Sequence, residues 1–155
     1  MENTHLLQEK QVVIFSLSRE EYGLPITRVQ EINRLAPITK LPQTPDFMEG
    51  IINLRGRVIP VIDLRKRFSI ALAENTEDTR IVIVEIGGQT AGMIVDSVTE
   101  VLTLSLASIE QPPASLSLNA KYIDGVGKVG DRLLILLDVD QILTNNEESV
   151  LRQIT

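Results

Sequence analysis

The chain has 155 residues, with 21 acidic and 15 basic side chains and a formal net charge of −6 at pH 7. It contains no Cys or Trp, so disulfides and thiolate sites are excluded. It contains one His, His5, so a catalytic or metal centre built from several histidines is excluded as well. Aromatic residues make up 3%, and this scarcity, with the acidic charge, argues against a nucleic-acid interface. We therefore expect a binding protein with no catalytic, cofactor-binding or metal-binding residues.

Charge and hydropathy also bear on partners and location. Residues 1–68 hold 10 basic and 8 acidic groups, whereas residues 69–155 hold 5 basic and 13 acidic groups. The first part can therefore meet an acidic partner that the second would repel. No apolar run approaches the roughly 20 residues that span a bilayer, and residues 1–11 do not resemble a secretory signal. We expect a cytoplasmic protein without membrane insertion.

In chain order, the pattern predicts short strands joined by turns. Apolar runs rich in β-branched residues lie at 12–15, 58–64, 81–86 and 133–139. Short helical turns are predicted at 27–32, 64–68 and 97–101, and surface loops at 73–79 and 105–121. A C-terminal helix follows, for which Asn145 or Asn146 is the expected N-cap.

An internal repeat organises these strands. At an offset of 69 residues, 12–17 aligns with 81–86 and 29–32 with 98–101; at an offset of 75, 47–63 aligns with 122–138. The repeat predicts two halves of approximately 10–70 and 79–145, with exchange of strands between them allowed. A unit of about 70 residues buries little surface alone. We therefore expect a mainly β protein of two pseudo-symmetric β-barrels sharing a core.

Two motifs suggest chemistry but have simpler explanations. Residues 125–130 match G-x-G-x-x-G, yet a strand-like run follows where a dinucleotide site needs a helix, so we expect a hairpin. Asp63 and Asp138 are equivalent in the repeat and could act as an acid–base pair. We expect instead that each caps or turns the chain after its strand.

The segment Asn53-Leu54-Arg55-Gly56-Arg57 lies between two apolar runs and predicts a tight hairpin turn at Arg55-Gly56. Such a turn presents Arg55 at an exposed tip, where it suits a carboxylate on a partner or is simply solvated. The basic run 65–67 is interpreted as a solvated face. Pro60 predicts that its strand is an edge strand or is bulged.

The pairs Val29/Ile32 and Val98/Val101 are equivalent in the repeat. If the halves are related by a pseudo-twofold axis, these apolar side chains can line one seam. If these side chains line a groove, they can accept the apolar face of an amphipathic helix. If they belong to the core, they only pack against other residues of this chain. The sequence leaves both interpretations open.

Four ordered motifs then carry a family resemblance: YGLPITRVQEI at 22–32, GIINLRGRVIPVIDLR at 50–65, GMIVD at 92–96 and GDRLLILL at 130–137. Over about residues 10–145 the chain resembles the CheW family of bacterial chemotaxis coupling proteins. The resemblance implies a CheW-like domain of two SH3-like five-stranded barrels over 10–145, with a helical tail over 146–155. It also implies an adaptor without catalysis.

The partners implied by the resemblance are the cytoplasmic tip of a methyl-accepting chemoreceptor and the regulatory domain of the histidine kinase CheA. Such adaptors are recruited to membrane receptor arrays and form mixed rings with the kinase. The family's receptor-binding positions fall on Val29, Gly92, Val98 and Val101, beside Ile32 from the seam. Positions important for coupling fall on Glu31 and Arg55, and kinase-facing positions on Ile26, Gly50 and Leu54.

Some features stay open at this point. Near Ser115, where the family can carry an aromatic ring contact, this chain has Pro112-Pro113-Ala114-Ser115, so that second interface is in doubt. One alternative is a coupling protein of a related system, such as type IV pilus control, or a fragment of a longer adaptor. Another is a small enzyme using Asp63 and Asp138, or a nucleotide-binding protein using the 125–130 loop.

Overall fold

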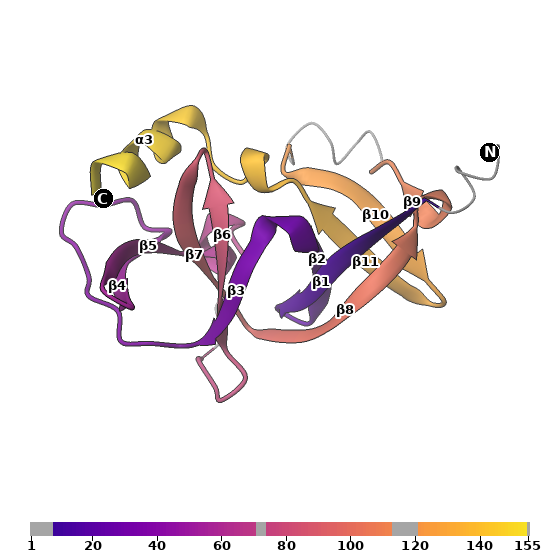
Figure 1. The fold of residues 1–155 in the computed structure, drawn as a ribbon, viewed down its shortest axis with the longest axis horizontal. Coiled ribbons are helices and arrows are strands. Elements are labelled where there is room, and N and C mark those ends of the chain that lie inside the picture. The colour runs from indigo at the N-terminus through magenta and orange to yellow at the C-terminus, as the bar shows by residue number, and fades with distance from the viewer. Residues whose placement is uncertain (1–7, 71–73, 113–120, 155) are drawn as a thin grey trace.

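The computed structural model describes residues 8–70, 74–112 and 121–154, and His5 and Ser115 lie outside these ranges. The described residues form two β-sheets and a few short helical segments (Figure 1). The strands are β1 (Glu9–Leu17), β2 (Glu20–Pro25), β3 (Val29–Arg34), β4 (Met48–Leu54), β5 (Arg57–Asp63), β6 (Arg80–Ile86), β7 (Gln89–Val95), β8 (Ser97–Ser105), β9 (Ile109–Glu110), β10 (Ile123–Val129) and β11 (Arg132–Leu137). The helical segments are η2 (Ile26–Arg28), α1 (Leu64–Arg67), η3 (Leu106–Ser108), η4 (Val139–Gln141) and α3 (Asn145–Ile154).

The two sheets repeat one topology. The six-stranded sheet has the order β8-β1-β2-β11-β10-β9, and the five-stranded sheet has the order β3-β6-β7-β5-β4. The sequence offsets make β1, β2 and β3 equivalent to β6, β7 and β8, and β4 and β5 equivalent to β10 and β11. When each strand in the five-stranded order is replaced by its repeat equivalent, the result is β8-β1-β2-β11-β10, which is the order of the first five strands of the six-stranded sheet. Each sheet contains one parallel pair, with Val61 opposite Gly92 in one and Leu136 opposite Gly23 in the other.

Each sheet takes strands from both predicted halves. Strand β3 pairs with β6, and β8 pairs with β1, so from its third strand onward each repeat lies in the other sheet from its first two strands. The predicted mainly β class is confirmed. The predicted strand number is wrong for one sheet, because β9 pairs with β10 and adds a sixth strand. Within the described ranges, no pairing joins the two outer strands of either sheet, so the SH3-like barrel stays a prediction.

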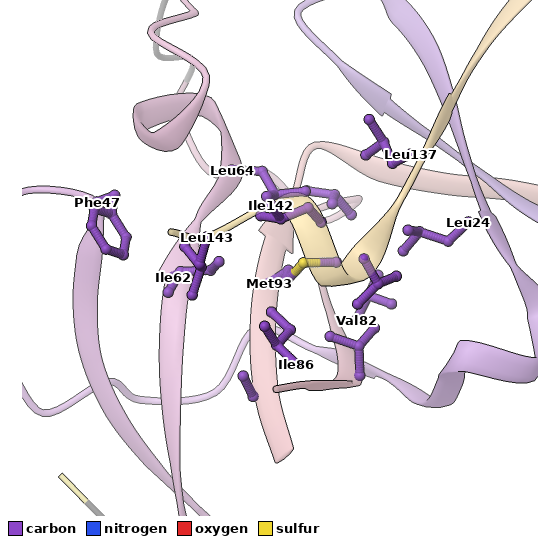
Figure 2. Packing of buried hydrophobic residues seen from close by; sticks show 14 of the residues in the cluster. Leu24, Phe47, Ile62, Leu64, Val82, Ile86, Met93, Leu137, Ile142 and Leu143 are labelled. Carbon is purple, nitrogen blue, oxygen red and sulfur yellow. The ribbon is translucent and has the colours of Figure 1, made fainter. Parts of the chain in front are cut away.

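One hydrophobic core lies between the sheets (Figure 2). Leu24 and Leu137 enter it from the six-stranded sheet, and Val82 and Met93 from the five-stranded sheet. Each sheet also encloses a smaller apolar cluster on its other face, and in β6 Ile81 belongs to that cluster. Because both faces of the central strands are buried, their sequences are continuous apolar runs rather than alternating patterns.

The predicted helical turn at 64–68 is confirmed by α1. Of the turn predicted at 27–32, only the part that lies in η2 is helical, and the turn predicted at 97–101 is wrong. Residues 29–34 and 97–105 are instead edge strands, whose backbone groups pair with β6 and β1. The predicted loop at 105–121 contains η3 and β9. Pro60 does not lie in an edge strand; the parallel pairing of β5 with β7 begins one residue later, at Val61.

The C-terminal helix is capped by Thr144 rather than by Asn145 or Asn146. The Glu147 backbone N–H donates to Thr144 Oγ1 at 3.2 Å, and Glu147 Oε1 accepts from the Thr144 backbone N–H at 2.7 Å. This reciprocal pair is a capping box. Leu151 is buried and anchors α3 to the shared core. No helix in the described part of the chain is long and apolar enough to cross a bilayer.

Candidate partner-binding surfaces

The four predicted seam residues lie on two edge strands, Val29 and Ile32 on β3 and Val98 and Val101 on β8. Val29 and Val98 are half-buried and pack against the shared core, whereas Ile32 is 38% and Val101 49% exposed. The first residue of each pair therefore packs as the core interpretation expected, whereas the second presents an apolar side chain to solvent, and the groove stays a prediction. The two strands diverge in Figure 1, one along each sheet.

The structure does not bring Gly92 to this surface. Gly92 is buried in β7, between β6 and β5, and a Cβ there would lie 2.8 Å from Ile81 Cγ2. Its repeat equivalent, Gly23, has the same role, with a Cβ 3.0 Å from Leu136 Cδ2. Gly92 therefore allows close packing inside the five-stranded sheet.

Glu31 and Arg55, the two predicted coupling residues, contact each other. Arg55 Nη1 donates to Glu31 Oε1 at 3.1 Å, and Nη2 donates to Oε2, so the pair is bidentate. The hydrogen bond from Arg55 lowers the pKa of Glu31, with a further contribution from the charge of Arg57. The Arg55 side chain is 71% exposed, so the pair contributes little to stability.

The predicted hairpin turn is confirmed. Arg55 and Gly56 have φ values of 52° and 85°, and Asn53 Oδ1 accepts from the Gly56 backbone N–H at 2.8 Å. A side chain larger than Asn at positive φ is uncommon and costs on the order of 1 kcal/mol. The turn therefore holds an Arg in a conformation that Gly would adopt without this cost, and local strain of this kind is frequent at functional sites.

The other three predicted kinase-facing residues have different surroundings. Leu54 precedes the turn and packs partly against the smaller cluster of the five-stranded sheet. Gly50 is buried with φ +146°, and a Cβ there would lie 2.1 Å from the backbone oxygen of Thr39. Ile26 is half-buried in η2, between β2 and β3. Only Leu54 is therefore adjacent to the Glu31–Arg55 pair along the chain.

The two chemistry-like motifs have structural roles. Gly125 and Gly127 lie in β10, and Gly130, with φ 59°, begins the turn into β11, so the expected hairpin is confirmed. Asp63 accepts from the Arg65 backbone N–H at 2.9 Å, and Asp138 accepts from that of Asp140 at 3.0 Å. Each carboxylate caps the helical turn after its strand, as expected.

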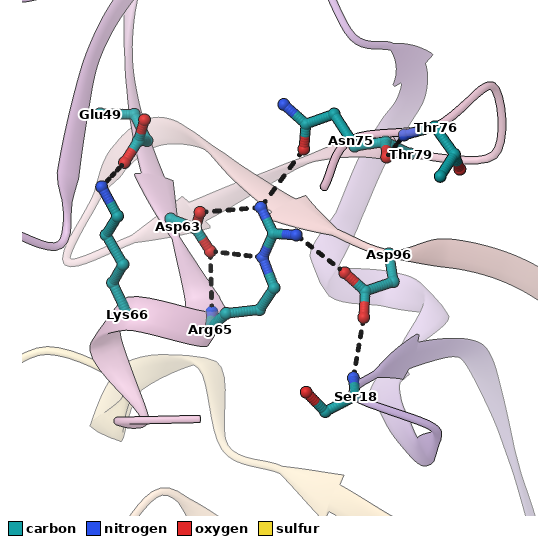
Figure 3. A network of polar contacts seen from close by, with 9 residues as sticks. All are labelled: Ser18, Glu49, Asp63, Arg65, Lys66, Asn75, Thr76, Thr79 and Asp96. Carbon is teal, nitrogen blue, oxygen red and sulfur yellow. Dashed lines mark hydrogen bonds and ion pairs between the residues drawn. The ribbon is translucent and has the colours of Figure 1, made fainter. Parts of the chain in front are cut away.

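Sequence reasoning missed a buried network around Arg65, which was interpreted as part of a solvated basic run. Its side chain is only 4% exposed. The guanidinium donates to both carboxylate oxygens of Asp63, at 3.0 and 2.9 Å, to Asp96 at 3.1 Å and to Asn75 at 3.3 Å (Figure 3). Asp96 also accepts from the Ser18 backbone N–H at 2.8 Å.

These features define an all-β protein with exposed edge strands and a charged hairpin, and the CheW-like domain model matches residues 11–147. The chain therefore belongs to the CheW-like domain family. It is 37% identical over 139 residues to the chemotaxis protein CheW of Klebsiella aerogenes, covering 89% of this chain and 84% of that protein. The Helicobacter pylori chemotaxis protein CheW is 37% identical over 133 residues, covering 86% and 81%.

A solved structure agrees with these relatives. The crystal structure of the scaffolding protein TtCheW from Thermoanaerobacter tengcongensis superposes with a TM-score of 0.83 at 46% identity, covering 90% of this chain and 91% of that chain. At this identity and coverage, the likeness extends to both sheets.

Proposed function

We propose that this chain is a non-catalytic adaptor that couples the cytoplasmic tips of chemoreceptors to the histidine kinase CheA. The observation that carries the proposal is the similarity to proteins named chemotaxis protein CheW along most of both chains. The adaptor would work in the cytoplasm and be recruited to membrane receptor arrays, in mixed rings with the kinase. Each sheet would take the form of an SH3-like barrel.

The receptor would bind along β3 and β8. Ile32 and Val101 present exposed apolar side chains there, and each strand pairs on one side only. A receptor tip is a helical hairpin, whose apolar face can cover such side chains. Val29 and Val98 would form the floor of this surface, because they connect it to the core.

The kinase would bind near the β4–β5 hairpin. The Glu31–Arg55 pair and Leu54 lie there, and the strained turn fixes the position of Arg55. Exposed charges of this kind set orientation and specificity more than affinity. In the free chain Arg55 is paired within its own chain, so a partner carboxylate would have to share or replace Glu31.

The receptor surface is tested with Val101→Asp, measured by pull-down of the purified receptor cytoplasmic fragment. The matched control is Val58→Asp, because Val58 on β5 is 52% exposed against 49% for Val101. We expect binding to fall for Val101→Asp and to stay unchanged for Val58→Asp. Receptor binding by Val101→Asp that is as strong as binding by Val58→Asp and by the unchanged protein would show that β8 is not the receptor surface.

The kinase surface is tested by exchanging the charges of the internal pair. Arg55→Glu and Glu31→Arg each break the pair, whereas the double variant restores it with reversed polarity. If the charges face the kinase, all three variants lose kinase activation in a reconstituted receptor–kinase array. Full recovery in the double variant would show that the pair acts only within the chain, and full activation by Arg55→Glu would remove Arg55 from the coupling surface.

A further inference from the structure

The chain crosses from one sheet to the other at two equivalent places, and a charged residue stands at each. Between β2 and β3 it passes from the six-stranded to the five-stranded sheet, and Arg28 is the last residue of the crossing. Between β7 and β8 it passes back, and Asp96 is the single residue between the strands.

Asp96 is bound to both sheets. Its Oδ1 accepts from Arg65 Nη1 at 3.1 Å, and Arg65 belongs to α1, which directly follows β5 of the five-stranded sheet. Its Oδ2 accepts from the Ser18 backbone N–H at 2.8 Å, and its own backbone N–H donates to Ser16 O at 3.0 Å. Both serines belong to the β1–β2 hairpin of the six-stranded sheet. We name Arg65–Asp96 the buried crossover pair; Figure 3 shows the pair and its contacts with Asp63 and Ser18.

Arg28 makes the corresponding contacts with reversed charge. It donates to both carboxylate oxygens of Asp140, at 3.0 and 2.8 Å, and to Glu85 O at 3.0 Å. Asp140 lies in η4, after β11 of the six-stranded sheet, and Glu85 lies in β6 of the five-stranded sheet. By the repeat offsets, Asp140 is equivalent to Arg65 and Glu85 to Ser16. We name Arg28–Asp140 the exposed crossover pair.

The crossover pairs precede the receptor-facing strands. Val29, the first residue of β3, directly follows Arg28, and Val98 lies two residues after Asp96 on β8. A change in either crossing would move the start of one strand relative to the other sheet. The separation of the apolar side chains on β3 and β8 therefore depends on how the two crossings are held.

We propose that the two crossover pairs are positioning elements that fix the angle between the sheets and thereby the width of the β3–β8 surface. The link to receptor binding rests on the proposed function; the link to sheet orientation does not. The pairs differ in exposure: side chains of the buried pair are 4% and 22% exposed, those of the exposed pair 32% and 54%. The exposed pair is the adjustable one, because solvent and salt weaken it more.

The experiment measures the distance between nitroxide labels on β3 and β8. The chain has no Cys, so cysteines introduced at the exposed positions Gln30 and Thr99, which are equivalent in the repeat, are the only labelling sites. In this background we compare Arg28→Asp, Asp140→Arg and the double variant. We expect each single variant to shift or broaden the distance distribution, and to weaken binding of the receptor cytoplasmic fragment by roughly fivefold or more. The double variant regains the ion pair but not the hydrogen bond to Glu85 O, so it should restore both in part.

The control breaks an ion pair of similar exposure that lies within one sheet. Lys10 on β1 and Asp124 on β10 are 28% and 52% exposed and 3.4 Å apart. Lys10→Glu should leave the β3–β8 distance unchanged, because both partners belong to the six-stranded sheet. A shift as large as that of Arg28→Asp would overturn the proposal, since any surface ion pair would then have the same effect.

Two further outcomes separate the proposal from the function on which it builds. Unchanged distances in both single variants would overturn the positioning role whatever the receptor does. A folded double variant whose distances are no closer to those of the parent than the distances of the single variants would overturn it too. Distances that shift while receptor binding stays constant would overturn the link to the receptor surface. If Val101→Asp also leaves binding unchanged, the proposed receptor surface itself is wrong, and the distances alone decide the positioning role.

Discussion

Removal of the Arg65 guanidinium should be among the most destabilising single changes in this protein. In Arg65→Met, the carboxylate of Asp63 loses two charge-assisted hydrogen bonds at a position where its side chain is only 4% exposed. An unpaired buried charge costs about 3–5 kcal/mol. That is a large share of the 5–15 kcal/mol by which domains of this size are typically stable.

The matched control is Arg28→Met, which removes an equally bidentate pair with Asp140. Because the side chains of Arg28 and Asp140 are 32% and 54% exposed, we expect Arg28→Met to lower the free energy of unfolding by only about 0–1 kcal/mol. Urea unfolding followed by circular dichroism gives both free energies by linear extrapolation. In Asp63→Asn/Arg65→Met the cap acceptor remains and the charge is gone, so we expect part of the stability to return.

A loss below about 1 kcal/mol for Arg65→Met, indistinguishable from that for Arg28→Met, would refute the reasoning. It would mean that Asp63 is solvated or protonated at little cost. A double variant less stable than Arg65→Met would also contradict it, because the penalty is assigned to the uncompensated carboxylate.

Three further predictions concern single positions. Gly92→Ala should lower the unfolding free energy by about 1–3 kcal/mol, because the new Cβ would lie 2.8 Å from Ile81 Cγ2; a loss below that seen for Gly56→Ala would contradict this. Gly56→Ala should cost only about 1 kcal/mol, since φ is +85° but no atom lies within 4 Å. The hydrogen bond from Arg28 lowers the pKa of Asp140, so in a carboxyl-carbon NMR titration Arg28→Gln should raise that pKa toward 3.8. The pair should therefore stabilise the fold above pH 3.8 and lose its effect as pH falls through the lower folded-state pKa; an unchanged pKa in Arg28→Gln would exclude this.

The strand positions could be predicted where both faces of a strand are buried. In β1 and β6, continuous β-branched and aliphatic runs mark the elements directly. The edge strands β3 and β8 were partly assigned to helical turns, and the i, i+3 spacing of Val29/Ile32 and Val98/Val101 is also compatible with a helix face. An edge strand packs on one side only, so its apolar pattern is sparse, and the long-range pairing with β6 or β1 decides its conformation.

The candidate sites were predicted unevenly for a similar reason. The Arg55–Gly56 turn follows from local rules, because Gly tolerates positive φ and apolar runs flank the turn. The pairing of Arg55 with Glu31 joins residues 24 positions apart and needs the folded sheet. Arg65 was assigned to the surface because a charge run is usually solvated. Its bidentate partner Asp63 is local, but Asp96, which also accepts from it, lies 31 residues away and is brought there only by the fold.

By itself, the sequence determined the duplicated unit, most of its strands and its tight turns. Those features depend on residue type, on spacing and on which backbone angles a residue tolerates, and these are local properties. Only the tertiary structure decided that the chain changes sheet before β3 and before β8 and that opposite charges meet at both crossings. The physical reason is that an apolar pattern specifies which faces are buried but not which strand supplies the hydrogen-bonding partner.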